Sequence, residues 1–195
     1  MADVLFGKVN PCGKLPVTFY RSSEQLPDYE DYSMKGRTYR YFDDPLYAFG
    51  YGLSYTTFSI ADAKIRINDE EHAADAVKSS SPEAGAPLSL SLSQLNAQLL
   101  VPVTNTGRRD GTEVVQLYVR DLNDSEGPLK TLRGFQRVAV KAGQTVTAVL
   151  PITVKTFELF DPSTNTVHVH SGRYELLYGT SSRSEDLQRL EVELK

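Results

Sequence analysis

The chain has 195 residues, 40% of them hydrophobic and 24% charged, which suffices for one complete domain and part of another in an ordinary globular protein. Its net charge of −4 argues against a nucleic-acid partner, because nucleic acids usually require a basic face. No apolar run approaches the roughly 20 residues that cross a bilayer, so no membrane partner is expected.

Residues 1–27 hold two short pieces of predicted structure. The Asn-Pro and Gly signals of Asn10–Gly13 predict a turn, and the composition of Val17–Tyr20 favours a strand. Two such pieces cannot bury a core of their own. We therefore interpret them as the last elements of a larger domain.

Residues 28–56 form an aromatic connector. Ten of the thirty residues from Tyr29 to Phe58 are aromatic, and the stretch has neither helical nor strand periodicity. It cannot form its own core, so we expect it to lie against another protein surface or a ligand. Three of its glycines fit positions where the backbone needs a positive φ or is closely approached by another group: Gly36, Gly50 and Gly52.

Residues 57–195 show strand signals at regular intervals and no credible long helix, which predicts a β-sandwich. An alternating segment at Phe58–Ile67 precedes strands expected at Gln98–Thr104, Thr112–Arg120, Leu132–Val140, Thr145–Ile152, Thr166–His170, Arg173–Tyr178 and Leu187–Leu194. The side chains expected to face inward are Leu99, Val101, Val103, Val115, Leu117 and Val119. One helical turn is expected within Val154–Leu159.

An insertion is predicted at residues 68–87. This stretch is acidic, rich in Ala and Ser, and free of aromatic residues. Such a composition buries little apolar surface and is typical of a flexible segment.

Carboxylates surround the aromatic connector, and acids beside aromatic rings are common in sugar sites. They are Asp28, Glu30, Asp31, Asp43 and Asp44. A glycosidase needs two carboxylates held at a fixed separation, which a sequence does not show. We interpret these residues as solvated loop acids and assign no catalytic residue.

A metal or cofactor site is not expected. His168 and His170 stand two residues apart on a predicted strand and would share a face. Zinc takes three or four protein ligands, and no third His or Cys is near them in the sequence. The single cysteine, Cys12, excludes an internal disulfide and is interpreted as an incidental thiol.

Three interpretations of the connector remain open: a seam between domains, one wall of a sugar site formed mainly elsewhere, or an independent binding platform. The candidate residues for sugar or interdomain contact are Arg37, Tyr39, Arg40, Tyr41 and Phe42. The two arginines are suited to stacking on tyrosine rings or to pairing with acids across a seam.

Several motifs follow one another in an informative order. They are Gly7–Phe19, Gly36–Phe42, Pro45–Phe58, Val103–Gly107, Asp110–Val119, Leu132–Phe135, Gly172–Leu176 and Gly179–Ser182. In this order they resemble the C-terminal portion of glycoside hydrolase family 3, which includes β-glucosidases and β-xylosidases. The stretch Gln25–Met34 looks closer to the xylosidase-like branch.

The resemblance implies a domain assignment. Residues 1–27 would be a remnant of the family's α/β sandwich domain, 28–56 an interdomain connector, and 57–195 a fibronectin type III-like, immunoglobulin-like β-sandwich. Family members carry the nucleophilic Asp on an N-terminal barrel and the acid/base Glu on the α/β sandwich. Neither region has a counterpart in this chain, so no catalytic residue is carried over.

The sequence therefore predicts the structural C-terminal part of a family 3 β-xylosidase or β-glucosidase acting on plant-derived oligosaccharides, which buttresses the catalytic domains and is inert alone. The alternatives are a non-catalytic polysaccharide-binding module and a standalone β-sandwich interaction domain. The expected partners are the catalytic domains of the parent enzyme, carbohydrate, and a second copy bound through the aromatic connector. For the parent enzyme we expect a periplasmic or extracellular location.

Overall fold

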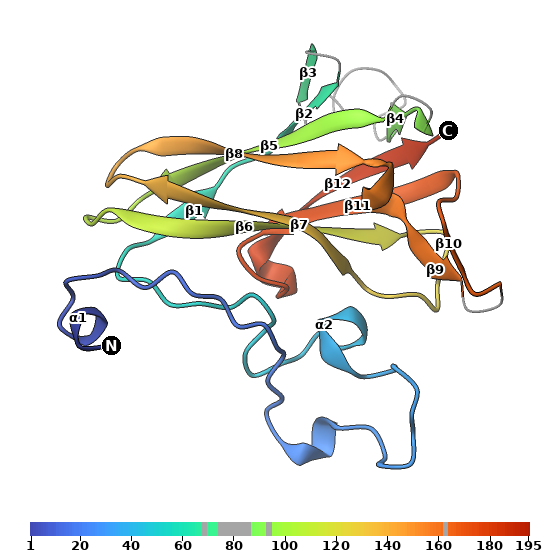
Figure 1. Ribbon diagram of the computed structural model, residues 1–195, viewed down its shortest axis with the longest axis horizontal. Coiled ribbons are helices and arrows are strands. Elements are labelled where there is room, and N and C mark those ends of the chain that lie inside the picture. The colour runs from blue at the N-terminus through green and yellow to red at the C-terminus, as the bar shows by residue number, and fades with distance from the viewer. Residues whose placement is uncertain (68–69, 74–86, 93–94, 162–163) are drawn as a thin grey trace.

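The computed structural model describes residues 1–67, 70–73, 87–92, 95–161 and 164–195. The larger part of the chain folds as two β-sheets packed face to face, and residues 1–57 form a mostly irregular layer along one side of them (Figure 1). The mainly β sandwich expected from the sequence is therefore confirmed.

The first sheet contains the strands β1 (Phe58–Ile60), β2 (Lys64–Ile67), β3 (Glu70–Ala73), β5 (Asn96–Asn105) and β8 (Thr145–Thr153). Its centre is β5, which pairs antiparallel along one edge with β8. β1 and β2 follow each other along the other edge of β5, and β3 pairs with β2.

The second sheet has the order β4 (Leu88–Leu90), β12 (Leu187–Leu194), β11 (Gly172–Gly179), β6 (Gly111–Asp121) and β7 (Thr131–Val140). Its pairs are antiparallel except for β4 with β12. The register of β6 against β7 shifts between Leu117 and Tyr118, where Arg133 is the additional residue of a β-bulge.

The remaining elements are short: α1 (Ala2–Leu5), α2 (Thr38–Tyr41), the 3₁₀ turns η1 (Ser23–Gln25), η4 (Val154–Phe157) and η5 (Ser184–Asp186), and the hairpin of β9 (Leu159–Asp161) with β10 (Thr166–His168). η4 confirms the expected helical turn and begins at a capping box in which Thr153 and Thr156 cap each other. Within the described residues, no helix has the length and apolar character needed to cross a membrane.

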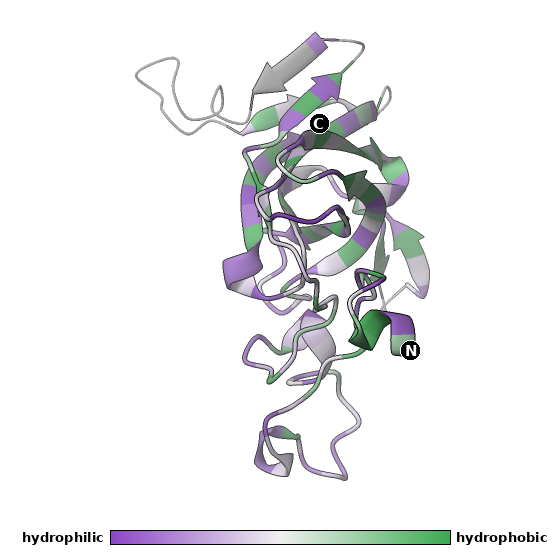
Figure 2. Cartoon of the chain, turned by 90° about the vertical axis from the view of Figure 1, so that its left-hand side faces the viewer, coloured by the Kyte–Doolittle hydropathy of each residue, from purple (hydrophilic) through white to green (hydrophobic). Residues whose placement is uncertain are grey.

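The core lies between the two sheets, where alternating residues of facing strands meet. Hydrophobic and hydrophilic residues alternate along the strands in Figure 2. The six side chains expected to face inward, which lie on β5 and β6, are all buried: Leu99, Val101, Val103, Val115, Leu117 and Val119. The strand periodicity of two therefore placed this part of the core correctly.

The structure differs from the sequence prediction at several elements: Asn10–Gly13 forms no turn, and the strand predicted at Thr166–His170 ends at His168. Glu70–Ala73 forms β3 in place of a flexible segment, because its backbone continues the ladder of β2, while 68–69 and 74–86 of the predicted insertion lie outside the described residues. Val17–Tyr20 forms a single bridge, Phe19 to Tyr47, since no longer ladder partner lies beside it in the described chain.

The end of β11 gives a test of the packing. A Cβ atom on Gly179 would overlap the carbonyl oxygen of Asp186, which is rigid backbone. We expect Gly179→Ala to lower the free energy of unfolding by about 1–3 kcal/mol, as overpacked substitutions do. Urea unfolding followed by circular dichroism measures this difference.

Gly134→Ala is the matched control in the same sheet. The nearest atom to its added Cβ is Leu150 Cδ2 at 4.0 Å, so the methyl group has room. Its urea midpoint should be unchanged or slightly raised. Equal destabilisation by both substitutions would contradict the packing at Gly179.

Candidate functional site

The candidate site is the seam where the aromatic connector covers the outer face of β6. The ring of Tyr39 stacks on Phe49 at a centroid distance of 4.4 Å and meets Tyr118 edge-on at 5.7 Å. The Tyr39 hydroxyl accepts a hydrogen bond from the Leu132 backbone N–H at 3.2 Å. Burial, with a smaller effect from Tyr39, raises the pKa of Tyr118 far above its usual 10.0, so this ring stays neutral.

Gln116 fastens the second half of the connector to β6. This side chain is 3% exposed, and its Nε2 donates to the carbonyl oxygens of Gly50 at 3.3 Å and Thr180 at 2.6 Å. Gly50 has φ +78° and approaches so closely that a Cβ there would overlap the Gln116 amide. The need for glycine expected at this position is thereby confirmed, as it is at Gly36, where φ is +70°.

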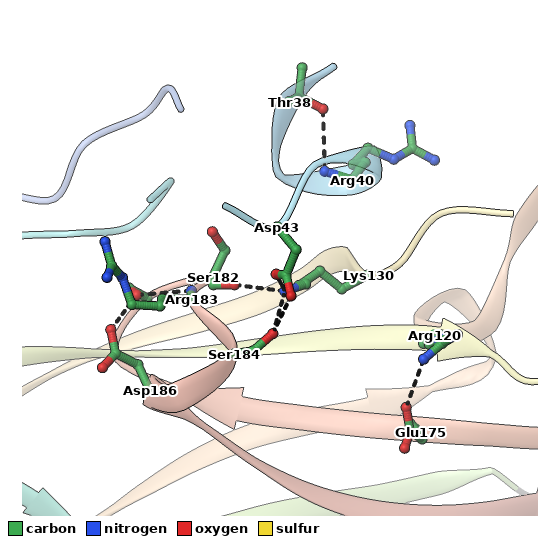
Figure 3. A network of polar contacts seen from close by, with 11 residues as sticks. Thr38, Arg40, Asp43, Arg120, Lys130, Glu175, Ser182, Arg183, Ser184 and Asp186 are labelled. Carbon is green, nitrogen blue, oxygen red and sulfur yellow. Dashed lines mark hydrogen bonds and ion pairs between the residues drawn. The ribbon is translucent and has the colours of Figure 1, made fainter. Parts of the chain in front are cut away.

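A buried lysine fastens the end of α2 to the loop after β11. Lys130 is 4% exposed, and its Nζ lies 2.7 Å from Asp43 Oδ1 and donates to the Ser182 carbonyl oxygen at 2.8 Å (Figure 3). Ser184 Oγ donates to the other Asp43 oxygen at 2.7 Å. Burial alone would raise the pKa of Asp43, but the hydrogen bonds from Lys130 and Ser184 outweigh it and hold that pKa below 3.8.

Two further contacts fix the layer where it enters the sandwich. The fully buried Asn105 accepts from Thr56 Oγ1 at 2.7 Å and donates to the carbonyl oxygens of Arg109 at 2.7 Å and Val140 at 2.9 Å. Lys14 Nζ pairs with Glu113 Oε1 of β6 at 2.7 Å. Residues far apart in the sequence are thus held against β5 and β6.

The structure does not gather the five candidate residues into one pocket. Tyr39 lies in the seam, and the Arg40 guanidinium lies 5.8 Å from the Tyr41 ring centre. Phe42 packs instead against Tyr20, at 4.8 Å between ring centroids. The Arg37 guanidinium donates to the backbone carbonyls of Asp31 and Ser33 and forms no ion pair among the described residues.

Two grooves are lined by residues of this layer. One, of about 470 Å³, is lined by residues including Val17, Leu26, Met34, Arg40 and Phe49. The other, of about 650 Å³, is lined by Phe19, Tyr47, Tyr51 and Leu53 among others. In the second groove Tyr47 contacts Phe19 edge-on at 6.3 Å and Tyr51 at 5.2 Å.

The connector carboxylates have structural contacts. Asp28 and Asp31 accept backbone N–H bonds two residues ahead at 3.0 and 2.8 Å, and Asp44 forms an exposed pair with Arg21 at 3.1 Å. The hydrogen bonds from Ser33 lower the pKa of Asp31. Such local turns account for these acids without a catalytic role.

His168 and His170 share a face, as the sequence predicted. Their Nε2 atoms lie 2.7 Å apart, at the last residue of β10 and two residues beyond it. Among the described residues, no group of three or more His, Cys, Asp or Glu is arranged to hold a metal ion.

Two protein-family models match this chain. A family model of the fibronectin type III-like domain matches residues 113–182, and the model of the glycosyl hydrolase family 3 C-terminal domain matches residues 1–55. The chain belongs to glycoside hydrolase family 3 and corresponds to the C-terminal portion of an enzyme of that family.

Particular relatives are similar over nearly the whole chain. A xylan 1,4-β-xylosidase of Xylanibacter ruminicola is 53% identical over 100% of this chain and 20% of its own length. A periplasmic β-glucosidase of Salmonella typhimurium is 35% identical over 93% of this chain and 23% of its own length. The solved structure of a β-glucosidase from Erythrobacter marinus matches with TM-score 0.74 and 34% identity, over 100% of this chain and 23% of that one. The chain thus spans about a fifth to a quarter of the length of these relatives.

The Asp43 carboxylate should make docking of the connector depend on pH. Because its pKa in the folded state lies below 3.8, its contribution to stability is complete above about pH 5 and is lost as the pH falls through the lowered pKa. We expect Asp43→Asn to be destabilised at pH 7 by about 1 kcal/mol, and the difference from the wild type to vanish near pH 2.

Urea midpoints of both proteins from pH 7 to pH 2 measure this effect, and their difference removes the contribution of other acids. Asp44→Asn is the control, because the Asp44 side chain is 73% exposed in its ion pair with Arg21. A difference between wild type and Asp43→Asn that stays constant over the whole range would contradict the assignment.

Gly50→Ala should loosen the connector without unfolding the sandwich. The added methyl group meets both the left-handed backbone and the Gln116 amide. Since proteolysis follows the population of the open form, tryptic cleavage after Arg37 and Arg40 should accelerate on the order of tenfold. Gly13→Ala is the control, because its added Cβ meets no atom within 4 Å. Equal cleavage rates in the two variants would disprove the role of Gly50.

Proposed function

We propose that this chain is a structural, non-catalytic part of a family 3 β-xylosidase or β-glucosidase. Its sandwich would hold the layer of residues 1–57 as a platform for the catalytic domains. One observation carries this proposal. The layer of residues 1–57 is fastened to the sandwich by buried polar contacts, yet it exposes large apolar side chains to solvent.

The exposed apolar side chains are concentrated in this layer. Among the described residues, fourteen of the nineteen large hydrophobic side chains that stand exposed belong to residues 1–55. They include Phe6, Tyr29, Tyr32 and Leu53, which are more than two thirds exposed. Exposed apolar surface of this extent usually marks a protein interface.

The hydrogen bonds between the layer and the sandwich also support a role as a platform. Gln116, Lys130 and Asn105 each bond one group of the layer, in Gly50, Asp43 and Thr56 respectively, and also bond groups of the sandwich, so the layer has one defined position on it. A surface that is already ordered binds a partner without the cost of ordering itself. The catalytic domains would therefore meet a preformed support.

The names of the relatives support a proposal for the substrate class and the location. The similar proteins are named as β-xylosidases and β-glucosidases, one of them periplasmic. We propose that the parent enzyme removes xylose or glucose units from plant-derived oligosaccharides in the periplasm or outside the cell. The sequence of the Gln25–Met34 stretch favours the xylosidase.

Assembly in solution tests the proposal. We would mix this chain with the portion of the Xylanibacter ruminicola xylosidase that lies outside the region matched by the chain. We expect the two to co-sediment and hydrolysis of an aryl β-xyloside to rise at least tenfold over the catalytic portion alone. The chain alone should show no hydrolysis, because loss of a catalytic nucleophile costs several orders of magnitude.

The matched C-terminal portion of that xylosidase serves as the positive control for assembly. Hydrolysis by the chain alone, or full activity of the catalytic portion without any C-terminal part, would contradict the proposal. Retention of the chain on insoluble xylan would favour the polysaccharide-binding alternative, for which the aromatic groove at Tyr47 and Tyr51 would be the candidate surface.

A further inference from the structure

Two imidazole rings converge on each other where the β9–β10 hairpin ends. The Nε2 atoms of His168 and His170 lie 2.7 Å apart. The two rings stand nearly perpendicular, with an angle of 82° between their planes and 4.2 Å between their centroids. His170 is exposed and His168 is partly exposed, so the pair faces solvent.

The backbone holds both histidines in place. His168 is the last residue of β10 and pairs with Leu159 of β9. The His170 carbonyl oxygen accepts a hydrogen bond at 3.0 Å from the hydroxyl of Tyr174, a fully buried residue of β11. Between the two histidines, Val169 packs against the core of the sandwich. With Val169 turned inward, its two neighbours share the outer side, and their rings meet there.

The separation of the two nitrogens is close to that in a metal chelate. A divalent transition metal binds imidazole nitrogen at about 2.0–2.1 Å, and two such bonds at about 90–109° to each other place the nitrogens about 2.9–3.4 Å apart. The rings therefore need to separate by less than about 1 Å and to turn their lone pairs toward the metal. The ring that donates the hydrogen bond moves its proton from Nε2 to Nδ1, which gives the other neutral tautomer.

The donor set selects the class of metal. Imidazole suits Cu²⁺, Ni²⁺ and Zn²⁺, and for a given set of nitrogen ligands the affinity is highest for Cu²⁺. Mg²⁺ and Ca²⁺ prefer oxygen ligands. Three or four protein ligands are the rule for zinc sites that close around the metal, and the described residues form no such group. Two histidines instead make an open chelate, in which water fills the remaining coordination positions.

We propose that His168 and His170 form a binding site for one divalent transition-metal ion, with Cu²⁺ bound more tightly than Ni²⁺ or Zn²⁺. The site is independent of the proposed platform role, because both ligands lie within three consecutive residues of this chain. A bound ion links the end of β10 to the segment that leads into β11. It stabilises the folded state, since only there are the two rings held on the same side.

Calorimetric titration of the chain with Cu²⁺, Ni²⁺ and Zn²⁺ tests the site. The double variant His168→Gln/His170→Gln measures binding elsewhere, because it keeps the N-terminal amine and His72, the third histidine of the sequence. We expect the wild type to bind Cu²⁺ on the order of a hundredfold more tightly than either single variant, because a second ligand on the same chain acts at a high effective concentration. Mg²⁺ should give the same heat with the wild type and the double variant.

Val167→His combined with His170→Gln is the matched control. Val167 is 58% exposed and directly precedes His168, so its side chain alternates to the other face of β10. This variant has as many histidines in the hairpin as the wild type, but they lie on opposite faces. It should bind Cu²⁺ as weakly as His170→Gln alone. Equal Cu²⁺ affinity of this variant and the wild type would overturn the chelate, since only the number of histidines would then matter.

The electron paramagnetic resonance spectrum of the Cu²⁺ complex identifies the ligands directly. After subtraction of the double variant's spectrum, two imidazole nitrogens should split the copper signal of the wild type. His170→Gln should leave the splitting of one nitrogen. A one-nitrogen spectrum of the wild type, or a Cu²⁺ affinity within about threefold of the double variant, would overturn the site and leave the pair as a hydrogen bond between two rings.

Stability gives a second measurement of the same site. A ligand that binds the folded state raises the urea midpoint as its concentration exceeds the dissociation constant. Saturating Zn²⁺ should therefore raise the midpoint of the wild type and leave that of the double variant unchanged. The same shift in both proteins would place the stabilising metal elsewhere and contradict the site. Far-UV circular dichroism of the variants without metal should match the wild type, because the substituted side chains face solvent.

Discussion

Strand β6 is buried on both faces over Glu113–Val119, and a two-layer sandwich accounts for only one of them. Val115, Leu117 and Val119 face the core between the sheets. Their neighbours Gln116 and Tyr118 point outward and are nevertheless buried, because Gly50 and Tyr39 of the connector cover them. The sandwich and the layer of residues 1–57 thus share one strand, and the contacts at Lys130 and Asn105 add to the hold of that shared strand.

The contacts of this seam divide into two kinds with different effects. Full burial of a large apolar side chain such as Tyr118 contributes about 1.5–3 kcal/mol without fixing a direction. Hydrogen bonds of Gln116 and the ion pair of Lys130 add less in net energy, but a displaced layer would leave these groups buried without partners. Burial of the rings therefore stabilises the contact, and the polar groups determine where the layer lies on the sheet.

The sequence revealed the sandwich because a period of two is visible wherever one sheet face is buried, as at Leu99–Val103 and Val115–Val119. It offered a seam as one of three interpretations of the connector, but not the residues of the sandwich that form it. Gln116 lies at an outward position of its strand, where a polar residue normally indicates solvent. Lys130 precedes a strand in a loop-like sequence and carries no signal of burial. Their environments are created by segments some 65 to 90 residues earlier in the chain, and a local pattern does not contain that information.

The two sides of the layer of residues 1–57 differ in how much apolar surface they leave exposed. On the sandwich side, the buried groups of Asn105, Gln116 and Lys130 have partners within the chain. Elsewhere on the layer, large apolar side chains such as Phe6, Tyr29 and Leu53 stand exposed to solvent. Covering β6 alone does not require such exposed side chains, and surface of this kind usually contacts another protein. This asymmetry is the physical argument that the layer has a second interface, with the sandwich as the support that holds it in place.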